Sequence, residues 1–190
     1  GDHLSQAFDQ LDARVERLSQ TAFGDHLRVT WGQGDRQILL LGHMDTVWPL
    51  GELEERPFKI ARDASGGFQK GTGPGIFDMK GGLIIGLYAI DALRALGLAP
   101  AHRLVFVLNS DEEVGSLTSR ALIEEEGRRS EAALVLEPSR EDALVTWRKG
   151  VGRFSLEIEG QASHSGAAHE RGVSAVTELA HQILHLEAMT

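Results

Sequence analysis

Cysteine is absent from this sequence of 190 residues, which excludes disulfide bonds, thiolate metal sites and a cysteine nucleophile. Any metal ion must therefore be bound by histidine, aspartate and glutamate. No apolar run approaches the roughly 18 residues that a helix needs to cross a bilayer. Basic residues are scarce, at 19 against 28 acidic ones, and the net charge of −9 disfavours nucleic acid. We therefore expect neither a membrane nor a nucleic acid as a partner.

Both ends of the sequence look cut. Residue 1 is glycine, and neither a basic nor an apolar leader follows it, so no signal peptide is visible and a cytoplasmic location is expected. Thr190 falls inside a segment whose pattern still indicates a helix. These features predict that the sequence is part of a longer protein.

Apolar residues amount to 42% of the chain, as is ordinary for a protein with a buried core. Strands are predicted from one alternating and three continuous apolar runs, at 27–31, 38–41, 104–108 and 133–136. The three continuous runs are typical of strands covered on both faces. Helices are predicted over 4–18, 82–97 and 117–126, and a long polar functional loop over 51–75. Strands that alternate with helices indicate an α/β fold, a mostly parallel sheet flanked by helices.

The pattern changes near residue 150. Residues 154–158 alternate between apolar and polar, which predicts a half-exposed strand, and a helix is predicted from about Ser174. We therefore expect two domains, residues 1–149 and residues 150–190.

Potential metal ligands follow each of the three buried strands. His43 and Asp45 follow 38–41, Glu112 and Glu113 follow 104–108, and Glu137 follows 133–136. Ligands bind at the carboxyl ends of parallel strands, and the Gly-rich segment before the 82–97 helix adds Asp78. One imidazole with several carboxylates suits Zn²⁺, with Co²⁺ or Mn²⁺ as alternatives. Spacing alone leaves a second interpretation open, in which the histidine serves a turn and the acidic residues are helix caps or solvated.

Five segments together resemble one known family. They are Gly42–Val47, Gly71–Gly82, Asp111–Ser116, Glu137–Ser139 and Ala162–Gly166. The sequence resembles the co-catalytic zinc family of glutamate carboxypeptidases, acetylornithine deacetylases, succinyl-diaminopimelate desuccinylases and aminoacylases, and is most similar to the glutamate carboxypeptidase-like branch. The resemblance implies a zinc-exopeptidase-like catalytic domain over residues 1–149. Residues 150–190 would then begin a ferredoxin-like α+β lid and dimerisation domain.

The resemblance implies two Zn²⁺ ions per intact subunit. His43 and Glu137 would hold one ion, Glu113 the other, and Asp78 would bridge both, with a cis peptide bond directly after it. Family members add a further ligand, a histidine near their C-terminus, which these residues do not include. We therefore expect this chain alone to hold one ion more tightly than a second and to hydrolyse poorly.

Three more residues acquire catalytic roles from the resemblance. Glu112 would be the general base, and Asp45 would accept a hydrogen bond from the second ring nitrogen of His43 and orient the ring. His164 would reach the active site of the partner subunit in a homodimer and polarise the scissile carbonyl.

The implied activity is hydrolysis of an amide or peptide bond next to a free carboxylate, in a small molecule or a peptide. Release of a C-terminal glutamate or a similar amino acid, as in a glutamate carboxypeptidase, is the first expectation. Two alternatives stay open. One is an N-acyl amino acid deacylase of the acetylornithine deacetylase or desuccinylase kind, and the other is a non-catalytic relative that binds metal or peptide. Keeping Glu112, which is useful for proton transfer and not for metal binding, argues against the second.

Overall fold

The computed structural model describes residues 1–62, 69–98, 100–139, 141 and 143–189. The chain divides into two compact units, Gly1–Leu144 and Val145–Thr190. Each unit is described below by itself. None of the described helices is both long and apolar enough to cross a membrane.

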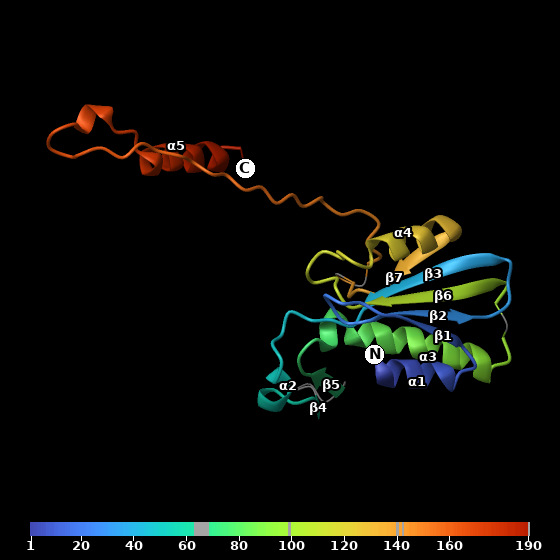
Figure 1. The fold of residues 1–190 in the computed structure, drawn as a ribbon. Coiled ribbons are helices and arrows are strands. Elements are labelled where there is room, and N and C mark those ends of the chain that lie inside the picture. Colours follow the sequence, from blue (N-terminus) through green and yellow to red (C-terminus); the bar gives the residue numbers. More distant parts are fainter. Residues whose placement is uncertain (63–68, 99, 140, 142, 190) are drawn as a thin grey trace. The chain divides into compact units, whose positions relative to one another are not determined.

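A five-stranded mixed sheet with the order β1-β2-β6-β3-β7 forms the centre of the first unit (Figure 1). The strands are β1 (Arg14–Leu18), β2 (His26–Trp31), β3 (Arg36–His43), β6 (His102–Asn109) and β7 (Ala132–Val135). β3 runs parallel to both β6 and β7, whereas β1 and β2 pair antiparallel to their neighbours. The predicted α/β fold is confirmed, and the strands that precede the candidate ligands form its parallel half.

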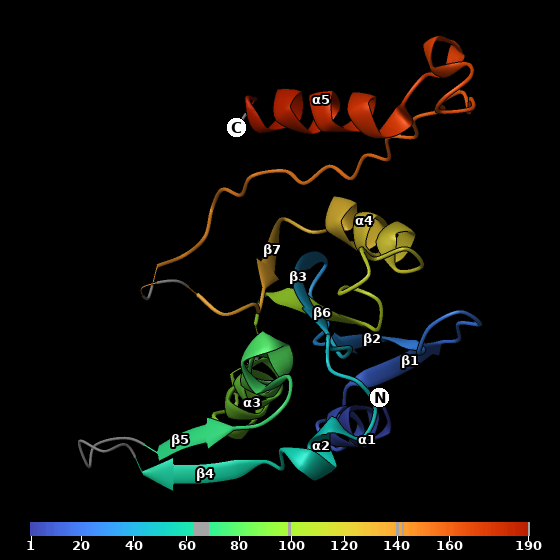
Figure 2. The same cartoon turned by 90° about the vertical axis from the view of Figure 1, so that its left-hand side faces the viewer.

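Helices cover the sheet on both faces (Figure 1 and Figure 2). α1 (Asp2–Asp9) and α3 (Gly81–Ala95) lie on one face, and α4 (Arg120–Arg129) lies on the other. On the first face Phe8 packs edge-on against Phe106 with ring centroids 5.6 Å apart, and both side chains are fully buried. A buried phenylalanine contributes about 1.5–3 kcal/mol through the hydrophobic effect. The hydrophobic cluster on the α1 and α3 face is larger than the cluster on the α4 face.

The predicted helix over 4–18 is wrong beyond its first half. The helix ends at Asp9, Asp12 has a positive φ of 58°, and β1 follows. In β1, Glu16 stands directly opposite Arg28 of β2, and their side chains form an ion pair at 2.8 Å. Pairing with a neighbouring strand thus outweighs the helical spacing, which local sequence cannot reveal.

The long polar stretch also contains regular structure. A short helix α2 (Glu52–Glu55) is followed by a two-stranded antiparallel sheet of β4 (Lys59–Arg62) and β5 (Gln69–Thr72). The residues of β4 and β5 are exposed. The prediction of a plain loop over 51–75 is therefore wrong in these parts, and residues 63–68 lie outside the described residues.

Two further predictions need correction in the first unit. β7, expected to be buried, is exposed along its length because it is the last strand of the sheet and pairs only with β3 among the described strands. The helix expected over 117–126 begins later, at Arg120. Before that point the backbone N–H groups of Thr118 and Ser119 donate to the side chain of Asp111.

The second unit contains one long helix, α5 (Ala175–Glu187), which agrees with the predicted start near Ser174. Ser174 caps it, because its Oγ accepts a hydrogen bond from Thr177 N at 3.1 Å. The described residues 154–158 form no strand, so that prediction is wrong: the alternating pattern has no partner strand in this unit. A domain boundary near residue 150 and the start of a lid domain stay predictions.

Candidate metal centre

The parallel half of the sheet brings most of the candidate ligands together. β3 ends at His43, β6 ends at Asn109 directly opposite it, and β7 lies on the other side of β3. The loop after β6 carries Glu112 and Glu113, and Glu137 follows β7 by two residues. Because these strands run in the same direction, their carboxyl ends meet at one edge of the sheet.

His43 lies at the centre of this group, and its side chain is only 1% exposed. Its Nε2 is 3.0 Å from Asp78 Oδ1, 3.2 Å from Glu137 Oε1 and 3.8 Å from Glu112 Oε2. Its Nδ1 is 3.1 Å from the carbonyl oxygen of Asp45 and 3.4 Å from Asp45 Oδ1. One ring nitrogen therefore faces three carboxylates, while the other faces Asp45.

Two sets of three side chains can each surround a metal ion. His43, Glu112 and Glu137 form one set, and His43, Asp78 and Glu113 form the other, with ligand atoms within 4.8 Å of one another in each. Imidazole nitrogen with carboxylate oxygens is a donor set that suits Zn²⁺ and also accepts Mn²⁺ or Co²⁺. Asp45 Oδ1 is buried without a hydrogen-bond partner among the described groups. These residues fit a metal ion, and the assignment of individual ligands to two ions stays a prediction.

Asp78 comes from a tight turn and not from a strand. It lies in the segment Ile76–Lys80 that leads into α3, where the backbone at Asp78 and Met79 is not helical, and the Asp78–Met79 peptide bond is cis. Gly75 has a φ of 67°, and a Cβ there would lie 2.4 Å from Thr46 Cγ2. Only glycine fits such a position without strain. The buried Met79 sulfur accepts a hydrogen bond from His43 N at 3.2 Å, which joins this turn to the end of β3.

The crowding of acidic groups changes the pKa values at the centre. Burial lowers the pKa of His43, but the charges of Asp45, Glu112 and Glu137 outweigh it and raise the pKa above its usual value. Burial, together with the neighbouring carboxylate of Asp78, raises the pKa of Glu113. Carboxylates held this close repel one another, and a divalent cation would relieve that repulsion.

Lys80 also belongs to this group of residues, although the sequence analysis did not include it among the site residues. Burial lowers its pKa, against the opposing effect of the carboxylates of Asp45, Asp78 and Glu113. An ammonium group that interacts with these three carboxylates belongs to the same cluster. The sequence feature that could have identified Lys80 is its position two residues after Asp78 in the Gly-rich segment.

A buried polar network supports the loop that follows β6. Asp111 is fully buried, and its carboxylate accepts hydrogen bonds from the backbone and hydroxyl groups of Thr118 and Ser119, at 2.6–3.1 Å. Burial raises the pKa of this carboxyl, but these hydrogen bonds outweigh it and lower the pKa to about 2. The sequence analysis gave Asp111 no role of its own, because its partners are seven and eight residues away.

His164 lies in the second unit, at a turn. Its Nδ1 accepts hydrogen bonds from the backbone N–H groups of Gly166 and Ala167, both at 3.1 Å. An accepting Nδ1 carries no proton, so in the neutral ring the proton is on Nε2. His164 and the candidate metal ligands belong to different units, and the catalytic role of His164 stays a prediction.

Comparison with known proteins settles the family. A model described as "Peptidase family M20/M25/M40" matches residues 39–190, which is most of the chain. The chain belongs to this peptidase family. The resemblance inferred from the five sequence segments is thereby confirmed.

Relatives in the M20 family carry carboxypeptidase and deacetylase names. Carboxypeptidase G2 of Pseudomonas sp. (strain RS-16) is 37% identical over 155 residues, which are 80% of this chain and 36% of the relative. Acetylornithine deacetylase of Pasteurella multocida (strain Pm70) is 32% identical over 159 residues, 83% of this chain and 39% of the relative. This chain therefore spans less than half the length of either relative.

A solved structure supports the fold. The chain is similar to the crystal structure of aminopeptidase PepT from Bacillus cereus ATCC 10987, with a TM-score of 0.68 and 22% sequence identity. The match covers 94% of this chain and 48% of that structure. At this level of identity the similarity supports the architecture of the chain and not its substrate.

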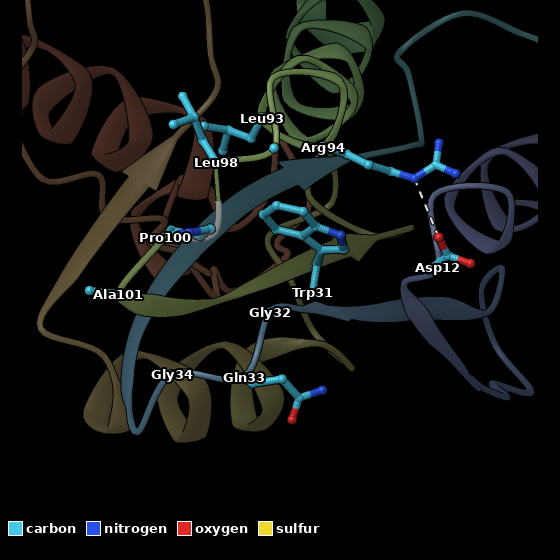
Figure 3. Close-up of a pocket in the computed structure, with 11 residues that line it drawn as sticks. Asp12, Trp31, Gly32, Gln33, Gly34, Leu93, Arg94, Leu98, Pro100 and Ala101 are labelled. Carbon is cyan, nitrogen blue, oxygen red and sulfur yellow. Dashed lines mark ion pairs between the residues drawn. The ribbon is translucent and has the colours of Figure 1, made fainter.

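A hollow of about 600 Å³ lies elsewhere in this M20 chain, at the amino ends of β3 and β6 (Figure 3). Trp31, Leu93 and Leu98 line it, and an ion pair between Arg94 and Asp12 at 3.3 Å lies beside them. None of the predicted site residues contributes to it. It is therefore separate from the metal centre at the opposite end of these strands.

Proposed function

We propose that this M20 chain forms the metal-binding part of a hydrolase that cleaves an amide or peptide bond next to a free carboxylate. The first expectation within this class is a glutamate carboxypeptidase-like activity. The observation that carries the proposal is the convergence of Asp78, Glu112 and Glu137 on one ring nitrogen of the buried His43. A relative at 37% identity that bears a carboxypeptidase name supports it.

The ligands proposed for two Zn²⁺ ions are His43, Asp78, Glu113 and Glu137, with Asp78 shared between the ions. When bound, zinc acts as a Lewis acid that polarises the carbonyl group and lowers the pKa of bound water. The contribution of the chain is to hold the donor atoms in place. Asp45 orients the ring of His43, since both its carbonyl oxygen and its carboxylate lie beside Nδ1.

Glu112 is proposed as the general base. Its side chain is 49% exposed, so its carboxylate is accessible to water and substrate, yet Oε2 lies only 3.8 Å from His43 Nε2. A carboxylate in this position accepts a proton from the attacking water and later donates it to the leaving amine. The adjacent Glu113 has its backbone N–H bound to Asp45 Oδ2 at 3.0 Å, which fixes the residue proposed as a ligand.

His164 is proposed to polarise the scissile carbonyl in a homodimer, acting across to the partner subunit. Its tautomer suits this role, because an Nε2–H group can donate a hydrogen bond to a developing oxyanion. Its Nδ1 is held by the backbone of the turn, so the ring is oriented before any substrate binds.

An N-acyl amino acid deacylase is the second candidate, and an acetylornithine deacetylase at 32% identity favours it. Both reactions hydrolyse an amide beside a carboxylate and would use the same residues. A panel of N-acyl amino acids and of peptides with different C-terminal residues distinguishes the two. A non-catalytic relative is expected to hydrolyse neither set while still binding metal.

The metal content of two variants tests the proposed division of roles. Glu112→Gln should keep the zinc content of the parent chain and lose any hydrolysis that the parent shows. Glu113→Gln should bind less zinc, since it removes a ligand. Each is measured by metal analysis after dialysis against limiting zinc. Equal loss of zinc in both variants would contradict the assignment, and no zinc in the parent chain would contradict the metal centre itself.

A further inference from the structure

Asp111 is the most completely enclosed carboxylate of the described structure, with no exposed surface. Its Oδ2 accepts hydrogen bonds from Thr118 N at 2.6 Å, Thr118 Oγ1 at 2.8 Å and Ser119 N at 3.1 Å. Its Oδ1 accepts from Ser119 Oγ at 2.6 Å and from Asn109 Nδ2 at 3.3 Å. Every one of these described donors is a neutral group. A buried charge satisfied in this way depends on the position of each donor.

These contacts close the loop that begins with Glu112 and Glu113. Ser116 N donates to the carbonyl oxygen of Asp111 at 2.7 Å, while the side chain of Asp111 holds Thr118 and Ser119. Both ends of the segment 112–117 are therefore attached to one residue. Moving that residue would move the backbone from which both glutamates project.

The network reaches outward from Asp111 on two sides. Thr118 Oγ1 also lies 3.0 Å from His26 Nε2, and the other ring nitrogen of His26 accepts a hydrogen bond from Ser110 N at 3.2 Å. On the second side Asn109 O accepts from Met44 N at 2.7 Å, which connects the loop to the residue after His43. The loop is thus fixed to both β2 and β3.

We propose that Asp111 is a positioning residue that holds the backbone of residues 112–117, and through it the carboxylates of Glu112 and Glu113, at the metal centre. This inference rests on the proposed function where it concerns the metal. Asp111 acts through its neighbours, because none of its described hydrogen bonds joins it to a carboxylate of the proposed metal ligands.

The test compares Asp111→Asn with Glu126→Gln. Glu126 is a matched control because it is also a buried carboxylate, within α4, that accepts hydrogen bonds from Gln37 and Arg28. Amide hydrogen exchange of residues 112–117 is measured in the presence of a chelator, together with thermal unfolding. We expect exchange in this segment to be about tenfold to a hundredfold faster in Asp111→Asn, because a hydrogen bond to a charged group is lost. In Glu126→Gln it should stay at the parent rate even if the thermal midpoint falls.

A second readout uses Co²⁺ as the probe. Its visible absorption reports the geometry of its ligands, so the spectrum of the Co²⁺-loaded chain should change in Asp111→Asn and remain that of the parent in Glu126→Gln. If the parent chain binds no Co²⁺, the proposed metal centre is contradicted, and the exchange measurement still decides the role of Asp111. Equal exchange and equal spectra in both variants would overturn the inference.

Milder variants cover the case in which Asp111→Asn does not fold. Thr118→Val and Ser119→Ala each remove one hydroxyl donor and leave the carboxylate in place. Each should accelerate exchange of residues 112–117 in the same direction as Asp111→Asn but to a smaller extent. Parent-like exchange in both would also overturn the inference.

Discussion

Asp111, in the loop before α4, and Glu126, within α4, are both buried carboxylates, but the charge of each is satisfied in a different way. Near the end of the helix, Glu126 is 3% exposed, pairs with Arg28 at 2.9 Å and accepts a hydrogen bond from Gln37 at 2.8 Å. Before its start, Asp111 is fully buried, and its described partners are hydroxyl, amide and backbone N–H groups. The charge of Glu126 is compensated by the opposite charge of Arg28. The charge of Asp111 is instead stabilised by neutral hydrogen-bond donors that one loop conformation holds in place.

Because of this difference, we expect the two networks to affect stability and site geometry differently. An ion pair between side chains from β2 and α4 joins two elements and leaves the backbone between them free to vary. Hydrogen bonds from successive backbone N–H groups instead fix the conformation of the residues that supply them. The Glu126 network should therefore matter for the fold alone, and the Asp111 network for the fold and for the proposed metal centre.

Removing the Glu126 carboxylate should have the largest effect on stability. Glu126→Ala leaves the buried Gln37 amide and the half-buried Arg28 without this partner, which should lower the free energy of unfolding by about 3 kcal/mol. Urea unfolding measures the change, and metal content should remain that of the parent chain. A loss of metal as large as the one expected for Glu113→Gln would break the comparison.

Acid should weaken the Asp111 network next. The pKa of Asp111 is lowered from 3.8 to about 2 in the folded chain, so its stabilisation is complete above the unfolded pKa and is lost as the pH falls toward the folded pKa. This pKa shift stabilises the folded chain by about 2 kcal/mol. About half of that stabilisation is lost once the pH has fallen to about 3. Urea unfolding of the chelated chain between about pH 5 and 3 should show this loss, and Asp111→Asn should lack it. The same loss in Asp111→Asn would assign the acid sensitivity to other groups.

Asp45 supplies a second attachment for the same loop, and a smaller effect is expected from its removal. Asp45→Ala leaves Glu113 N without its acceptor, which should cost about 1 kcal/mol. The amide of Glu113 should then exchange faster. Glu113→Ala is the control, because it removes the neighbouring side chain and keeps this amide hydrogen bond. Slow exchange of the amide in Asp45→Ala would show that Asp111 holds the loop without help.

The exposed face of α4 should show the smallest effect. Arg120 and Glu124 form an ion pair at 2.9 Å, with side chains that are 79% and 43% exposed. Solvent screens such a pair, so Arg120→Gln should leave the urea midpoint unchanged within error. A loss comparable to that of Glu126→Ala would mean that a charge on α4 stabilises the fold whether it is buried or exposed, which would contradict the special role given to the buried Glu126.

Much of the site could be predicted from the sequence because its parts are local. Apolar runs at 38–41 and 104–108 identified the parallel strands, and His43, Glu112 and Glu113 follow them directly in the chain. Strand direction then placed these residues at one edge of the sheet. Glu137 could be predicted in the same way, although the strand before it is exposed at the edge of the sheet and not buried as expected.

The chain's own residue order determined the α/β fold, the helices α3 and α5 and the set of residues at the carboxyl ends of β3, β6 and β7. Only the tertiary structure decided what depends on a distant partner. Residues 14–18 became a strand because β2 lies beside them, and Asp111 became a supporting residue because Thr118 and Ser119 turn back onto it. Periodicity reports which side of an element is apolar, whereas hydrogen bonds and ion pairs depend on which groups the fold brings within reach.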